Sequence, residues 1–182
     1  IVLRAAMIRR DEVSTMDRVS IELFRQNAWA NERLLEACRA LPPQQLELTI
    51  AGTYGTIGVT LTHLLAAEQR YIRTLSGDVR AAPLSERNGF PGIDALVEHA
   101  RWSGERLTAL SEIVEPGETF DQAYGGKRYR TARGIVLVQA FEHGTEHRAH
   151  VTVTMSFHGI TPPALDGWTY GHRTGRAVEL GA

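Results

Sequence analysis

The stretch Phe-Glu-His-Gly-Thr-Glu-His-Arg-Ala-His-Val, residues 141–151, decides how the rest of the chain is interpreted. It continues a run of Val, Leu, Ala and Phe residues that is typical of a buried helix. His143 and His147 are four positions apart. On an α-helix of ~3.6 residues per turn, this spacing puts both imidazoles on one face, about 6 Å apart along the axis. Two rings so placed can bind the same metal ion.

A third histidine lies in a second apolar helical pattern. His63 stands in Leu-Thr-His-Leu-Leu, residues 61–65. If the two helices pack antiparallel, His63 can lie beside His143 and His147, and three neutral imidazoles would hold a divalent metal ion with one coordination position open. The alternative is a metal-free core of hydrogen-bonded histidines, since an unsatisfied buried polar group costs roughly 1 to 3 kcal/mol.

The pattern differs from the His-Glu-x-x-His signature of zinc peptidases. Glu142 precedes the first histidine, and Gly144 stands where the catalytic glutamate of those enzymes would be. Peptidase chemistry is therefore disfavoured. His150 follows His147 by three positions, so it could be a fourth ligand, a proton shuttle or a partner that orients a ligand.

The remaining acidic and histidine side chains are expected to have ordinary roles. Glu68, Glu142 and Glu146 could each orient an imidazole through its second ring nitrogen, but a solvated carboxylate on a helix face is the preferred interpretation. Three further histidines have no partner at a useful spacing and are expected to be surface or hydrogen-bonded core residues: His99, His158 and His172.

Length and composition fit one ordinary domain. The chain has 182 residues, of which 43% are hydrophobic, and we expect a leader or unassigned segment at residues 1–16 and a single domain at residues 17–182. Twenty Lys and Arg against 21 Asp and Glu give a net charge of -1, which predicts no bulk attraction to nucleic acid or to an anionic membrane.

Cysteine usage and hydropathy favour a cytoplasmic protein. The single cysteine, Cys38, excludes an intramolecular disulfide framework and lies in a helical apolar pattern, so a buried structural thiol is expected. No run approaches the ~18 to 20 apolar residues that a membrane-spanning helix requires.

Apolar periodicity predicts an all-α fold, a four-helix bundle. Thr56 is the expected N-cap of the second helix and Gly77 its stop, whereas Gly104 is expected to weaken the third. The fourth helix is apolar on more than one side and should be the most buried. The expected helices cover residues 17–41, 56–75, 92–114 and 131–158.

The connecting segments carry turn signals. Residues 44–53 read as an extended connector and residues 78–92 as a long loop. A short hairpin-like excursion is expected at residues 118–131, around Gly-Gly. The aromatic residues Trp168 and Tyr170 are expected to fold back over the bundle.

Four segments together resemble the DinB/YfiT-like proteins in order and spacing. They are Asn-Ala-Trp-Ala-Asn (27–31), Thr-His-Leu-Leu-Ala-Ala-Glu (62–68), His-Gly-Thr-Glu-His-Arg (143–148) and Trp-Thr-Tyr-Gly (168–171). The resemblance covers nearly the whole chain from about Asp17. It implies a four-helix bundle, frequently a homodimer, that binds zinc or nickel through three histidines.

Residue by residue, the resemblance places the metal ligands at His63, His143 and His147. The chain departs from many relatives at Glu146, where they have a further histidine, and at residues 149–150, where they have Gly-Gln in place of Ala-His. The surroundings of the metal are therefore expected to be unusual.

The leading expectation for function is a metal-dependent thiol S-transferase or hydrolase acting on a small-molecule substrate. A divalent metal would lower the pKa of a bound water or low-molecular-weight thiol, and His150 or a nearby carboxylate would move the proton. The second expectation is a non-catalytic bundle, either a stress-related binding protein or a metal-stabilised dimer module.

Overall fold

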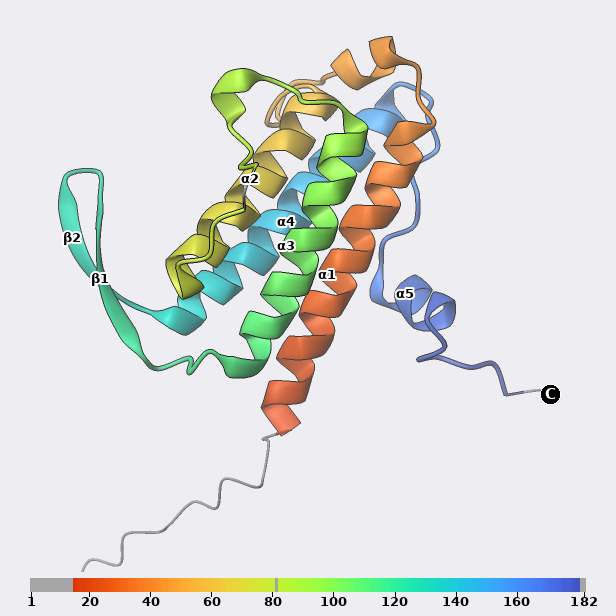
Figure 1. Cartoon of the computed structure of the whole chain (residues 1–182). Helices are drawn as coiled ribbons and strands as arrows, with labels where there is room; N and C mark the ends of the chain where they lie inside the picture. The colour runs from red at the N-terminus through yellow and green to blue at the C-terminus, as the bar shows by residue number, and fades with distance from the viewer. Residues whose placement is uncertain (1–14, 81, 181–182) are drawn as a thin grey trace, which may run out of the picture.

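The structure is a computed structural model that describes residues 15–80 and 82–180. Its four long helices confirm the predicted bundle: α1 (Thr15–Arg39), α2 (Ile57–Ser76), α3 (Ile93–Ile113) and α4 (Arg133–Phe157). In the bundle α1 packs along α3, and α2 packs along both α3 and α4 (Figure 1). Apart from the first two residues of α1, the segment expected at residues 1–16 lies outside the described residues, and the single domain at residues 17–182 stays a prediction.

The predicted ends of α2 are confirmed. The Thr56 side chain accepts a hydrogen bond from the Val59 backbone N–H at 3.3 Å, which satisfies one of the amides that a helix start leaves free. Gly77 follows the helix with φ of 77°, a left-handed conformation that glycine adopts without steric cost. These two residues fix where α2 begins and ends, and therefore where His63 lies.

The interior of the bundle has two apolar clusters separated by a polar layer. The largest members of the first cluster include Leu34, Leu64, Leu96 and Met155. The second cluster includes Phe24, Ile72, Leu107 and Ala140. Along each long helix, buried polar residues separate the two clusters: Asn27, Asn31, Glu68, Ser103 and Arg148. Apolar periodicity predicted the buried faces of these helices but not the polar layer between the two clusters.

The prediction that the fourth helix is the most buried is wrong. More of the α2 side chains than of the α4 side chains are buried, although α2 is shorter. Ile135, Val138 and Phe157 of α4 are exposed. Apolar residues surround α4, but among the described residues its neighbours cover only part of its circumference.

Cys38 is a buried structural thiol, as predicted. Its side chain is fully enclosed in the first apolar cluster. Burial raises the pKa of the thiol to about 12, because the thiolate would lose its hydration. The thiol is therefore neutral and unreactive near pH 7.

Within the described residues, no helix combines the length and the apolar character needed to cross a membrane.

The connections are partly as predicted. The hairpin is confirmed as β1 (Thr119–Tyr124) paired antiparallel with β2 (Lys127–Ala132), and it projects from the bundle (Figure 1). Gly125 and Gly126 form its turn with φ of 57° and 75°, the two positive values that a type I′ turn requires. The prediction of an extended connector at residues 44–53 is wrong in part, because Pro43–Glu47 forms a short 3-10 helix that buries Leu46.

The aromatic tail folds back by only one of its two rings. Within α5 (Gly167–Arg173), Tyr170 packs on Trp29 at 5.5 Å between ring centroids and is 6% exposed, whereas Trp168 is 79% exposed. Residues two positions apart on a helix point to different sides. The prediction therefore holds for Tyr170 and is wrong for Trp168.

Gly104 permits a close approach of α1 and α3. A Cβ atom at this position would lie 2.7 Å from the Cβ atom of Ala28, which is closer than two carbon atoms can pack. The helix tolerates the lower propensity of glycine here because a side chain would force the two helices apart.

We expect Gly104→Ala to destabilise the protein, although alanine is the better helix former. The overlap with Ala28 should outweigh the propensity gain and leave a net loss of about 1–2 kcal/mol, measured by urea unfolding. Gly117→Ala, where a Cβ atom meets nothing within 4 Å, is the control. In the Ala28→Gly background the Gly104→Ala loss should shrink; an unchanged loss would contradict the steric explanation.

Candidate metal centre

The bundle brings His63 of α2 together with His143 and His147 of α4. One ring nitrogen from each of the three residues lies within 4.8 Å of the other two. Nε2 of His63 and Nε2 of His143 lie 3.0 Å apart. Ring centroids are separated by 4.9 Å, 4.8 Å and 4.3 Å. The predicted convergence of the three side chains is therefore present, and their role as ligands stays a prediction.

The donor set fits a divalent metal ion. Nitrogen ligands of a tetrahedral zinc ion lie at ~2.0–2.1 Å from the metal and hence roughly 3.3 Å from one another, which is within the range of the observed separations. Burial, and then the neighbouring histidines, lower the pKa of His143 and of His147 to about 4. Both imidazoles are therefore neutral near pH 7, the form that binds metals.

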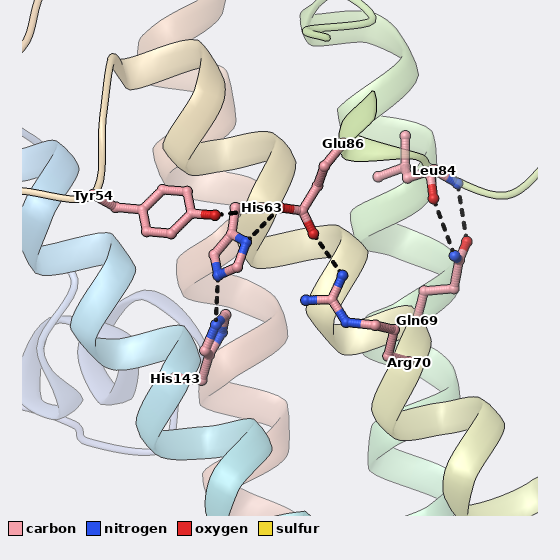
Figure 2. A network of polar contacts seen from close by, with 7 residues as sticks. All are labelled: Tyr54, His63, Gln69, Arg70, Leu84, Glu86 and His143. Atoms are coloured by element: carbon pink, nitrogen blue, oxygen red, sulfur yellow. Dashed lines mark hydrogen bonds and ion pairs between the residues drawn. The ribbon is translucent and has the colours of Figure 1, made fainter. Parts of the chain in front are cut away.

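Glu86 is the carboxylate that contacts the histidine cluster, and sequence reasoning missed it. Its Oε2 atom lies 2.7 Å from Nδ1 of His63, and its Oε1 atom accepts a hydrogen bond from Nη1 of Arg70 at 2.6 Å (Figure 2). Burial alone would raise the pKa of Glu86, but the contacts with His63 and Arg70 outweigh it and hold the pKa below its ordinary value. Glu86 is therefore ionised, and its carboxylate can accept hydrogen bonds but cannot donate them.

Tyr54 covers the outer side of the cluster. Its ring stacks on His63 with centroids 3.9 Å apart and planes at 20°, and it meets His147 edge-on at 5.1 Å. Its hydroxyl group donates to Oε2 of Glu86 at 3.3 Å. Because Tyr54 is 45% exposed, the cluster lies just beneath the protein surface.

His150 lies beside the cluster but does not belong to the group of three. Its ring meets that of His147 at a centroid separation of 5.3 Å. Its Nδ1 atom is buried and has no hydrogen-bond partner among the described residues. This position favours a proton shuttle or an orienting partner beside the site over a fourth ligand. A catalytic role for His150 stays a prediction.

Glu68 is not the solvated carboxylate that was predicted. It is fully buried, and it accepts hydrogen bonds from Nδ2 of Asn27 at 2.9 Å, from Nδ2 of Asn31 at 2.8 Å and from the hydroxyl group of Ser103 at 2.5 Å. Nη1 of Arg148 donates to Oδ1 of both asparagines at 2.6 Å and 2.8 Å. The two carboxamides therefore bridge the buried guanidinium group of Arg148 and the buried carboxyl group of Glu68.

Burial determines the direction in which the pKa of each ionisable member of this network shifts. Burial raises the pKa of Glu68 despite its hydrogen bonds and the nearby Arg148 charge, and burial lowers the pKa of Arg148 to about 10. Three donors surround the Glu68 carboxylate, which is the arrangement that stabilises the ionised form. Asn27 and Asn31, four positions apart on an apolar helix, are the feature of the sequence from which this network could have been predicted.

Gly144 is required by the same network. A Cβ atom at this position would lie 2.7 Å from Oδ1 of Asn27 and 2.9 Å from Nη1 of Arg148. The side of α4 at Gly144 faces α1, and there is no room at this position for the glutamate of a peptidase motif. Glu142 and Glu146 are exposed, as predicted.

The other three histidines lie away from the cluster. His99 is buried in α3, where its Nδ1 atom lies 3.3 Å from Nη1 of Arg80. Nε2 of His158 lies 3.2 Å from the backbone oxygen of Thr49. His172 is exposed in α5. These environments agree with the expected structural or surface roles.

Fold and side-chain geometry define a helical bundle with a candidate three-histidine metal centre between α2 and α4. A family model, described as the DinB family, matches residues 13–178. The chain therefore belongs to the DinB family.

Two further comparisons agree. Protein DinB of Bacillus subtilis (strain 168) is 21% identical over 165 residues, covering 85% of this chain and 95% of that protein. The crystal structure of a DinB-like protein from Bacillus cereus ATCC 10987 superposes with a TM-score of 0.57 at 20% identity, covering 76% of this chain and 89% of the other. At this identity the structural similarity shows a shared fold.

We expect Arg148→Met to destabilise the protein by about 3–5 kcal/mol in denaturant unfolding, because Glu68 would stay buried without its compensating cation. Arg39→Met, which removes an exposed arginine paired with Asp94, should change stability little. Adding Glu68→Gln to Arg148→Met should restore part of the loss. Equal stability of Arg148→Met and Arg39→Met would contradict the role of the network.

Proposed function

We propose that the protein is a metal-dependent enzyme in which His63, His143 and His147 hold one divalent metal ion, zinc or nickel. The observation that carries this proposal is the convergence of three ring nitrogens within 4.8 Å, from helices that are far apart in the sequence. Family membership supports it, because the DinB/YfiT-like resemblance places ligands at the same three positions. A bound divalent metal supplies Lewis acidity that makes water or a low-molecular-weight thiol a stronger nucleophile at neutral pH.

The proposed reaction is transfer of a thiol to an electrophilic small molecule, or hydrolysis. In the transfer, the sulfur forms a bond to the electrophilic carbon, the leaving group departs with its electron pair, and the thiol proton moves to a base. The partly exposed rings of Tyr54 and His63 bound the surface through which a substrate would reach the centre. We assign the proton-accepting role to His150, whose ring contacts His147.

The metal assignment predicts the loss of bound metal in three variants. His63→Ala, His143→Ala and His147→Ala should each retain far less than the roughly one metal ion per chain of the unchanged protein. Metal content is measured by mass spectrometry after purification without added metal and again after equilibration with zinc. His158→Ala and His172→Ala are matched controls outside the cluster. Full metal content in all three cluster variants would disprove the assignment.

The assignment of His150 predicts a slower reaction with unchanged metal content. His150→Gln should reduce the rate of conjugation of bacillithiol, mycothiol or glutathione to an electrophile by roughly 10² to 10⁴-fold, because no side chain would accept the proton. His158→Gln is the control. A metal-loaded His150→Gln protein with the unchanged rate would rule out this role.

A second candidate function is a non-catalytic bundle, either a stress-related binding protein or a metal-stabilised dimer module. Two grooves whose lining does not include the three histidines favour this alternative. One of about 580 Å³ is lined by Gln26, Thr145, Leu165 and other residues, and one of about 460 Å³ by Phe24, Ile135, Val138 and others. The metal-loaded protein would then bind metal normally without accelerating thiol transfer or hydrolysis.

Assembly and location belong to the same proposal. The exposed apolar residues Ile135 and Val138 beside the smaller groove are compatible with the homodimer that the family resemblance implies. The single buried Cys38 is compatible with the proposed cytoplasmic location. Nucleic-acid binding is not part of the proposal, since the net charge is -1.

A further inference from the structure

The side chain of Gln69 in α2 holds the backbone of the loop between α2 and α3. The Gln69 carboxamide accepts a hydrogen bond from the Leu84 backbone N–H at 3.0 Å and donates one to the Leu84 backbone oxygen at 3.2 Å (Figure 2). Both polar groups of one loop residue are thus satisfied by a residue of the helix. This pair of bonds fixes the position of the loop along α2.

Two residues further on, the fastened loop delivers Glu86 to the histidine cluster. His63 and Arg70 are seven positions apart, so they lie on the same face of α2 two turns from each other. Glu86 bridges them, with one carboxylate oxygen on Nδ1 of His63 and the other on Nη1 of Arg70 (Figure 2). Arg70 therefore holds the carboxylate in the orientation in which it meets the imidazole.

The contact with Glu86 selects one tautomer of His63. With one carboxylate oxygen of Glu86 paired to Arg70 and the other 2.7 Å from Nδ1 of His63, we expect the imidazole to donate from Nδ1, which leaves its lone pair on Nε2. Nε2 is the atom that faces His143 at 3.0 Å. The Nδ1 atoms of His143 and His147 are buried without a hydrogen-bond partner among the described residues. Of the three rings, His63 is therefore the one oriented by a carboxylate.

We propose that Glu86 is a positioning residue of the metal centre and that Gln69 acts on the centre through Glu86. The loop between α2 and α3 would thus set metal affinity, although none of its residues is a proposed ligand. This inference rests on the proposed metal centre, and it adds two residues that have no part in the ligand assignment. Carboxylates that orient a metal-binding histidine are a general feature of metalloproteins.

Zinc affinity in competition with a chromophoric chelator tests the inference. Glu86→Ala should weaken zinc binding by roughly 10 to 100-fold. Glu86→Gln keeps an oxygen that can accept from Nδ1 and should recover part of the affinity. Asp94→Asn, which removes another partly paired surface carboxylate, is the control and should bind zinc normally. Unchanged affinity in Glu86→Ala would overturn the inference.

The tautomer of His63 provides a readout that a purely structural role would not change. In long-range proton–nitrogen spectra of the metal-free protein, His63 should carry its proton on Nδ1 and should lose this preference in Glu86→Ala. Thermal unfolding of the metal-free variant should stay close to that of the unchanged protein, since Glu86 is partly exposed. A preserved tautomer in Glu86→Ala would contradict the positioning role.

A double-mutant cycle tests the order of action. As a single substitution, Gln69→Leu should weaken zinc binding. Added to Glu86→Ala it should cause no further loss, because the hydrogen bonds of Gln69 act on the centre through the Glu86 carboxylate. Additive effects would show that Gln69 does not act through Glu86.

The two proposals fail in different ways. If His63→Ala loses zinc while Glu86→Ala keeps its affinity, the metal centre stands and the positioning role is wrong. If His63→Ala, His143→Ala and His147→Ala all keep zinc, the ligand assignment itself is wrong, and the positioning role falls with it.

Discussion

The buried network that links Glu68 to Arg148 through Asn27 and Asn31 is the constraint on which the arrangement of the four helices depends. Removing a carboxylate and a guanidinium group from water costs several kcal/mol per ion unless hydrogen bonds and the opposite charge replace hydration. Here Asn27 and Asn31 supply that replacement from α1, and Ser103 supplies it from α3. The network forms only if the four helices are aligned along the bundle axis in one particular way. Apolar contacts alone would tolerate small shifts between the helices.

The same constraint also places the three histidines of the candidate metal centre. Glu68 follows His63 by five positions in α2, and Arg148 directly follows His147 in α4. The network that links Glu68 to Arg148 fixes α2 and α4 relative to α1, and in this arrangement His63 lies beside His143. The predicted meeting of distant histidines therefore depends on polar residues that contribute no ligand.

Sequence reasoning recovered the parts of the structure that local patterns determine. The helices, the cap at Thr56, the hairpin turn and the spacing of His143 and His147 each follow from neighbouring residues. The burial of Glu68 was missed because its partners come from α1, α3 and α4. Glu86 was missed for the same reason: a loop has no periodicity, and its contact with His63 exists only after the chain has folded back.

The two sets of contacts made by α4 follow from helix geometry. Consecutive residues are about 100° apart around the axis, so His143 and His147 face α2, while Gly144 and Arg148, one position later in each turn, face α1. The proposed ligands and the buried network thus share one backbone segment. A rotation or slide of α4 that relieved one set of contacts would disturb the other, so both sets of contacts support the same position of α4.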